Sequence, residues 1–214
     1  MQHELQVLQA VAQLTSAEVR AHLAYDGYLP EWQTRPVDFA AEYTARVREI
    51  HTYGYGAFAQ YHMFMVRNQE IIPVKHPDAT RLSDLKGYER QRKMVEDNTL
   101  ALMQDKPAAN VLLYGDAGTG KSSTVKALAN AYHKQGLRLI EVPKKQIFAI
   151  PDLVEALSEN PLHFILFIDD LSFTGEHEDF GALKAILEGS VSAKPANVAI
   201  YATSNRRHLI KESF

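Results

Sequence analysis

The chain has 214 residues, of which 46% are hydrophobic and 23% are charged, and its formal net charge is −3. This length and composition predict one large globular domain or a domain with an appendage, with no need of a disulfide or metal to complete the core. The absence of cysteine excludes thiol catalysis and zinc thiolate sites. The apolar runs are too short to cross a bilayer and the N-terminus does not resemble a secretory signal, so we expect a cytoplasmic protein without a membrane partner. The sequence contains no basic stripe of the kind that would indicate binding to nucleic acid.

Residues 1–72 are predicted to form an N-terminal helical region. Apolar residues recur at helical spacing through residues 4–24 and again through residues 34–50. Half of the aromatic residues of the chain lie within residues 25–64. A partner-docking surface is one interpretation of this pattern, but apolar residues at helical spacing favour a packed helical core. Two prolines in residues 73–80 indicate an extended connector to the following domain.

Helices and strands are predicted to alternate regularly through residues 81–214. The strands are continuous apolar runs, which indicates a parallel sheet buried on both faces and therefore an α/β fold. The predicted helices span residues 88–104, 121–135, 151–160 and 180–189, and the predicted strands span Asn110–Gly115, Leu137–Pro143, His163–Asp169 and Asn197–Thr203.

The segment GDAGTGKS, Gly115–Ser122, matches the phosphate-loop pattern G-x-x-x-x-G-K-[ST] and lies between a predicted strand and a predicted helix. Its glycines let the backbone curl so that N–H groups point at phosphate oxygens, and the helix adds the positive end of its dipole. Lys121 would contact the β- and γ-phosphates as a catalytic residue, and the Ser122 hydroxyl would hold Mg²⁺. The predicted nucleotide-binding residues are Gly115, Asp116, Ala117, Gly118, Thr119, Gly120, Lys121, Ser122 and Ser123.

Polar residues also end the two strands that we expect beside this loop. Asp169 would bind Mg²⁺ through water, and Asp170 would polarise the attacking water. Asp170 is one methylene shorter than the glutamate usual at this position in ring-forming ATPases, so slow turnover is one expectation. Asn205 would contact the γ-phosphate, with Thr203 and Ser204 as less favoured choices. The alternative is that these side chains only cap the ends of the strands.

Six segments together resemble a bacterial family of AAA+ ATPases, catalogued as domain of unknown function 815: LSDLKGYERQRKMVEDNTLAL, NVLLYGDAGTGKSSTVKAL, RLIEVPK, FILFIDDLSF, LKAILEG and NVAIYATSNRRHLI. The resemblance covers residues 81–214 and implies a P-loop NTPase with an AAA+ core that binds ATP, without an established biological role. It also implies that Leu85–Tyr88 lie near the adenine. One departure is Ala117, where the family pattern has arginine.

An AAA+ core normally has five parallel strands in the order 5-1-4-3-2, followed by a helical lid. Four strands are predicted in this chain, so we expect the fifth strand, the lid and the arginine finger to lie beyond Phe214. Arg206 and Arg207 follow Asn205 at the end of the site expected to face the γ-phosphate. They could act in this site, in the site of a neighbouring subunit or on DNA, or they could be ordinary surface or C-cap residues. Because arginine fingers contribute about 10³–10⁵ in rate, we expect this chain to bind Mg-ATP weakly and turn it over poorly. The longer protein would be an ATPase that self-associates through its AAA+ core.

The favoured function is an ATPase module that couples the binding and hydrolysis of Mg-ATP to conformational or assembly work on an unknown client, either protein or DNA. The first alternative is a nucleotide-gated recruitment or loading module with little hydrolysis, and the second is a P-loop phosphotransferase. A GTPase is disfavoured because the chain lacks the Asn-Lys-x-Asp motif that reads guanine.

Overall fold

The computed structural model describes residues 2–171 and 195–205, and the chain divides into two compact units, Met1–Glu49 and Ile50–Phe214. The predicted helix over residues 180–189 lies outside the described residues, as do Arg206 and Arg207. Within the ranges that the structure describes, we find no helix with the length and apolar character needed to span a membrane.

The first unit contains three helices, α1 (Gln2–Gln13), α2 (Ser16–His22) and α3 (Phe39–Arg48). The apolar pattern predicted a continuous helical stripe over residues 4–24, but Thr15 divides it into two helices. The Thr15 hydroxyl accepts a hydrogen bond from the Glu18 N–H, and the Glu18 carboxylate accepts one from the Thr15 N–H. This reciprocal capping box starts a new helix at α2. Asp38 caps α3 by accepting a hydrogen bond from the N–H of Ala41.

The helical core predicted for this first unit is not found among its described residues. No side chain of α1, α2 or α3 is buried. Trp32 is 44% exposed and Tyr28 is 85% exposed, although the Trp32 indole N–H donates a hydrogen bond to the Leu14 carbonyl. Other exposed apolar side chains are Val7, Leu8, Val11, Leu23, Tyr43 and Val47. Helical spacing aligns such residues on common faces, but a unit this small has too few elements to enclose them.

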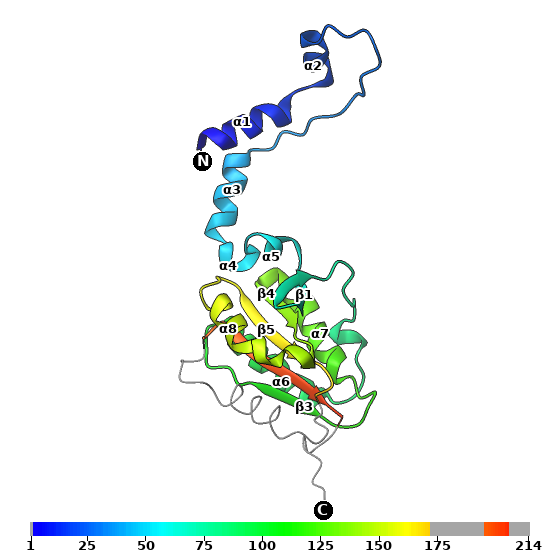
Figure 1. The fold of residues 1–214 in the computed structure, drawn as a ribbon, viewed down its shortest axis with the longest axis vertical. Coiled ribbons are helices and arrows are strands. Elements are labelled where there is room, and N and C mark those ends of the chain that lie inside the picture. The colour runs from blue at the N-terminus through cyan, green and yellow to red at the C-terminus, as the bar shows by residue number, and fades with distance from the viewer. Residues whose placement is uncertain (1, 172–194, 206–214) are drawn as a thin grey trace, which may run out of the picture. The chain divides into compact units, whose positions relative to one another are not determined.

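The described part of the second unit is built on a six-stranded sheet in the order β2-β1-β4-β5-β6-β3 (Figure 1). All adjacent pairs are parallel except β1 and β2, which are antiparallel. This confirms the four predicted strands, and their order from β3 to β4 is the 1-4-3-2 part of the order expected for an AAA+ core. The strands are β1 (Met63–Arg67), β2 (Glu70–Pro73), β3 (Val111–Tyr114), β4 (Leu137–Glu141), β5 (His163–Ile168) and β6 (Val198–Ser204).

The hairpin of β1 and β2 corrects the predicted helical region, because residues 63–73 belong to the sheet. Asn68 and Gln69 join the two strands with φ angles of 51° and 66°. Two successive left-handed residues are the geometry of a tight two-residue hairpin turn. The sequence did not reveal this turn because glutamine replaces the glycine that usually marks it. Phe64 and Val66 are buried because β1 adds to the edge of β4.

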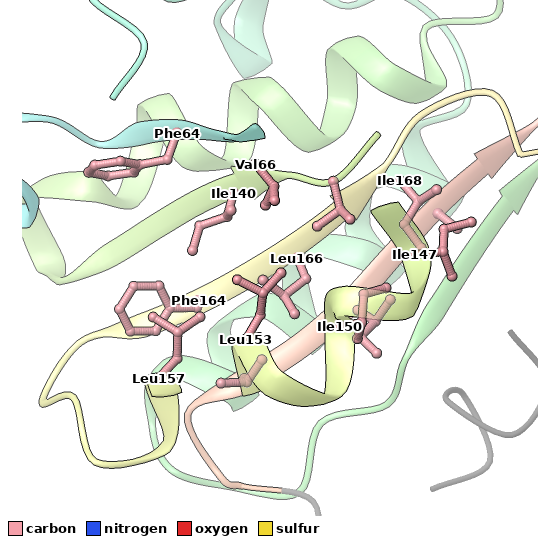
Figure 2. Close-up of a cluster of buried hydrophobic side chains, with 14 of the residues drawn as sticks. Phe64, Val66, Ile140, Ile147, Ile150, Leu153, Leu157, Phe164, Leu166 and Ile168 are labelled. Atoms are coloured by element: carbon pink, nitrogen blue, oxygen red, sulfur yellow. The ribbon is translucent and has the colours of Figure 1, made fainter. Parts of the chain in front are cut away.

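Helices cover both faces of the sheet. One face packs against α8 (Ile150–Ser158) and the preceding 3₁₀ segment η3 (Lys144–Ala149), with Leu153 and Leu157 of α8 directed at the strands (Figure 2). The other face packs against α6 (Glu89–Met103) and α7 (Lys121–Tyr132). In β5, Leu166 belongs to the first cluster and the neighbouring Phe167 to the second, because successive residues of a strand point to opposite faces. Coverage of both faces explains why every residue of β5 is buried and why the strand is a continuous apolar run.

Arg138 connects the segment before β1 to the sheet by hydrogen bonds. This segment contains the short helices α4 (Ile50–Tyr53) and α5 (Ala57–Gln60). Arg138 is only 5% exposed. Its guanidinium donates hydrogen bonds to the backbone carbonyls of Tyr53 (3.3 Å), Phe58 (2.8 Å), His133 (2.8 Å) and Leu137 (2.9 Å). Burial lowers the pKa of Arg138 to about 10, so the group keeps its charge at neutral pH, where the four carbonyl dipoles stabilise it.

Candidate functional site

The loop between β3 and α7 turns at two glycines. Gly118 has a φ of 78° and Gly120 has a φ of 80°, a left-handed conformation that glycine adopts without strain. A β-carbon at Gly118 would meet no atom within 4 Å, so the backbone conformation, and not a lack of space, requires glycine there. Gly120 is the N-cap of α7. The first N–H groups of that helix, which lack helical partners, therefore face the end of the loop.

The ammonium group of Lys121 lies against this loop. It donates hydrogen bonds to the backbone carbonyls of Gly115 (2.9 Å) and Asp116 (2.7 Å), and it is 3.4 Å from the Thr119 hydroxyl. It also donates to Oδ1 of Asn205 at 3.1 Å. The predicted phosphate-binding lysine thus connects the loop that follows β3 with Asn205, the residue that follows β6.

Ser122 and Asp169, the two predicted ligands of Mg²⁺, are in direct contact. The Ser122 hydroxyl donates a hydrogen bond to Oδ1 of Asp169 at 2.5 Å, and the Thr203 hydroxyl donates to the same oxygen at 2.6 Å. Partial burial by itself would raise the pKa of the Asp169 carboxyl, but the hydrogen bonds from Ser122 and Thr203 outweigh it and lower this pKa below its usual value. Asp169 is therefore a carboxylate at neutral pH. A hydroxyl and a carboxylate at one point supply the hard oxygen ligands that Mg²⁺ prefers, so these residues fit the ion.

Asp170 follows Asp169 in the chain, but its side chain has different partners. Its backbone has a left-handed φ of 50°. Its Oδ1 accepts a hydrogen bond from Nδ2 of Asn205 at 3.0 Å, and its Oδ2 is 3.7 Å from Nζ of Lys144. Because Asn205 also accepts from Lys121, the three predicted catalytic residues form one connected group.

The remaining predicted residues lie around this group. Ala117 is exposed at the tip of the loop, and Ser123 is partly buried in the first turn of α7. Leu85, which the family resemblance places near an adenine, lies beside the end of the loop, since its Cδ2 would be 3.9 Å from a β-carbon on Gly120.

Lys144 is the member of this group that sequence reasoning did not find. It follows β4, which is the neighbour of β5 in the sheet. The carboxyl ends of neighbouring parallel strands meet at one edge of a sheet. The strand order expected for an AAA+ core therefore already implied that Lys144 lies near Asp170, although no motif in the sequence singles out this lysine. Thr203, which the sequence ranked below Asn205, is in contact with Asp169.

The parallel sheet and its loop at the start of α7 define an α/β fold of the P-loop class. Residues 57–214 match the model of the family described as "Protein of unknown function (DUF815)". The chain belongs to that family, and the match includes the hairpin of β1 and β2 upstream of the expected residue 81.

Known proteins give two further findings. A solved structure described as AMPPCP-bound DnaA from Aquifex aeolicus is similar to this chain with 19% sequence identity and a TM-score of 0.42. The similarity covers 62% of this chain and 44% of that chain, so it spans less than half of the other protein. A comparison with curated proteins found no match.

Proposed function

We propose that the second unit binds Mg-ATP as an AAA+ module and that it hydrolyses ATP to drive conformational or assembly work on a client. The observation that carries this proposal is the meeting of Lys121, Ser122, Asp169 and Asn205 at one edge of the sheet, joined by hydrogen bonds. These residues come from a loop and two strands that are far apart in the sequence. Side chains that only cap strand ends need no hydrogen bonds to one another.

The loop and its lysine are proposed to hold the phosphates. The N–H groups at the start of α7 and the charge of Lys121 both favour an anion at the loop. The contacts of Lys121 with the carbonyls of Gly115 and Asp116 would be exchanged for contacts with phosphate oxygens. This exchange keeps the ammonium group hydrogen-bonded throughout, which limits its cost.

Ser122 and Asp169 are the residues that would hold Mg²⁺. The serine proton is already donated to Asp169, so the lone pairs of the Ser122 oxygen are available to the ion. Mg²⁺ would neutralise charge on the phosphates of the bound nucleotide. Asp170 is proposed to accept the proton of the attacking water, and Asn205 to orient that water or the γ-phosphate.

A nucleotide-gated recruitment module with little hydrolysis is the second candidate. One observation favours it: both oxygens of Asp170 already have partners, in Asn205 and Lys144. A carboxylate held by these two partners is less free to turn towards an attacking water. In either case, we propose that the AAA+ core also mediates self-association.

Release of phosphate from ATP separates the two candidates. The ATPase proposal predicts slow but continuous release by the unaltered chain and a further loss of about 10²-fold in Asp170→Asn, with an ATP affinity within about threefold of the original. Tight ATP binding without release, and with an ATP-dependent change in oligomeric state, would favour the recruitment module. Transfer of phosphate only to an added acceptor would contradict both and indicate a phosphotransferase.

A further inference from the structure

Thr203 lies near the end of β6 and contacts three successive residues that follow β5. Its side chain is buried, with 1% exposure. The hydroxyl donates a hydrogen bond to Oδ1 of Asp169 at 2.6 Å and accepts one from the N–H of Asp170 at 2.9 Å. The carbonyl of Thr203 accepts a hydrogen bond from the N–H of Leu171 at 2.6 Å. A single residue of β6 therefore holds the whole turn that carries both acids.

The hydroxyl of Thr203 determines how the Asp169 carboxylate is presented. Among the described residues, the hydrogen bonds to this carboxylate all reach Oδ1, from the hydroxyls of Ser122 and Thr203 and from the N–H of Asp170. Oδ2 is then the oxygen left for an ion or for a water molecule bound to it. Without the Thr203 hydroxyl, Oδ1 loses one of two hydroxyl donors and rotation of the carboxylate becomes easier.

The same hydroxyl also supports the backbone of Asp170. The φ of 50° at this residue is a conformation that costs energy for an aspartate. Two consecutive N–H groups, those of Asp170 and Leu171, are bound by the hydroxyl and the carbonyl of Thr203. These bonds offset the cost of the left-handed turn, and the turn directs the Asp170 side chain towards Asn205.

We propose that Thr203 is a positioning residue of this site, whose hydroxyl orients Asp169 for Mg²⁺ and holds the backbone of Asp170 in place. The inference rests on the proposed binding of Mg-ATP. Thr203 acts through the two acids, so its removal should weaken the response to Mg²⁺ and leave the binding of metal-free ATP to the loop almost unchanged.

Two substitutions of Thr203 separate the hydroxyl from the shape of the side chain. Thr203→Val replaces the hydroxyl with a methyl group of similar size, and Thr203→Ser keeps the hydroxyl. Thr99→Val is the matched control, because Thr99 is also fully buried and its hydroxyl bonds to the Val95 carbonyl and to the Tyr201 hydroxyl, with no contact to either acid. ATP affinity is measured on the full chain with a chelator and across a series of Mg²⁺ concentrations, together with thermal unfolding.

The valine protein should need about tenfold more Mg²⁺ for the same gain in ATP affinity, with chelator-measured affinity within about twofold of the unaltered chain, and the serine protein should stay within about threefold. An unchanged Mg²⁺ requirement in the valine protein would overturn the proposal, and so would an equal shift in Thr99→Val. If the valine protein does not fold, Thr203→Ala replaces it. If neither folds and the serine protein does, the hydroxyl serves only the fold, and the proposal fails.

The unaltered chain distinguishes this proposal from the proposed function. If it binds no ATP at any Mg²⁺ concentration, the proposed function fails and this inference fails with it. If it binds Mg-ATP and the Thr203 variants respond to Mg²⁺ as it does, only the role of Thr203 is refuted.

Discussion

Replacing Arg138 with methionine should destabilise the second unit by about 2–4 kcal/mol, because four backbone carbonyls lose a charged hydrogen-bond donor. The side chain is 5% exposed and makes hydrogen bonds to four backbone carbonyls. Loss of a donor to a buried carbonyl costs about 1–3 kcal/mol. The expected total is smaller than four such losses for two reasons. The His133 carbonyl keeps a hydrogen bond from the Gly136 N–H. Methionine also removes the cost of burying a charge and adds apolar contact of about 1–2 kcal/mol.

Equilibrium unfolding in urea measures this change in the free energy of unfolding. The midpoint should fall while the slope with urea stays the same, since the surface exposed on unfolding is little altered. Arg138→Lys is the matched variant, because it keeps the charge but its single nitrogen cannot reach all four carbonyls. Its free energy of unfolding should lie between those of the wild type and Arg138→Met. Limited proteolysis should cut first within α4 and α5 in the methionine protein, because Arg138 joins Tyr53 and Phe58 to the sheet.

A loss below about 0.5 kcal/mol, which is within the range of ordinary surface substitutions, would refute this reasoning about Arg138. Equal destabilisation by lysine and methionine would also refute it, because the hydrogen bonds would then not depend on the shape of the guanidinium. Preferential cleavage elsewhere would show that α4 and α5 do not depend on this side chain.

Three further predictions concern other parts of the second unit. Desolvation lowers the pKa of His62 in the folded protein, so the unfolded chain binds more protons and stability should fall as the pH drops below about 6.5. His62→Gln should therefore reduce the difference in thermal midpoint between about pH 7.5 and pH 5.5, and an unchanged difference would contradict this prediction. Tyr201→Phe removes a buried hydroxyl that contacts Asn98 and Thr99, both at 2.9 Å, and should cost about 1–2 kcal/mol in urea unfolding; a more stable protein would count against it. Asn205→Ala should lower phosphate release by about 10²-fold while ATP affinity changes by less than about threefold; equal losses of both would mean that Asn205 serves binding alone.

The sheet core of the second unit was predictable because its physics is local. β5 is a largely apolar run of the length that a strand covered on both faces requires, with Pro161 before it and Asp169 after it. The meeting of Asp169 with Ser122 also followed from the rule that parallel strands end at one edge. The sequence placed both residues at one predicted Mg²⁺ site, but it did not predict the direct hydrogen bond between them.

The features that escaped prediction depend on partners far away in the chain. The hairpin turn at Asn68 and Gln69 has no glycine, and its strands are stabilised by pairing with β4, about 70 residues later. Lys144 reaches Asp170 because β4 lies beside β5. The expected strand order implied this adjacency, but no motif marks the lysine. In the first unit, the apolar pattern predicted helices but not the break at Thr15, and a pattern does not tell what covers a helix face. The structure leaves Trp32 exposed.

The most direct test of the proposed function is calorimetric titration of ATP, in the presence of Mg²⁺, into the full chain and into Lys121→Ala. Lys106→Ala is the control, because Lys106 lies at the opposite end of β3 from the loop and bonds to Gln104. We predict saturable binding by the unaltered chain and by Lys106→Ala, and at least about tenfold weaker binding by Lys121→Ala. Equal affinity of the two alanine variants, or no binding by the unaltered chain, would contradict a nucleotide site at this loop.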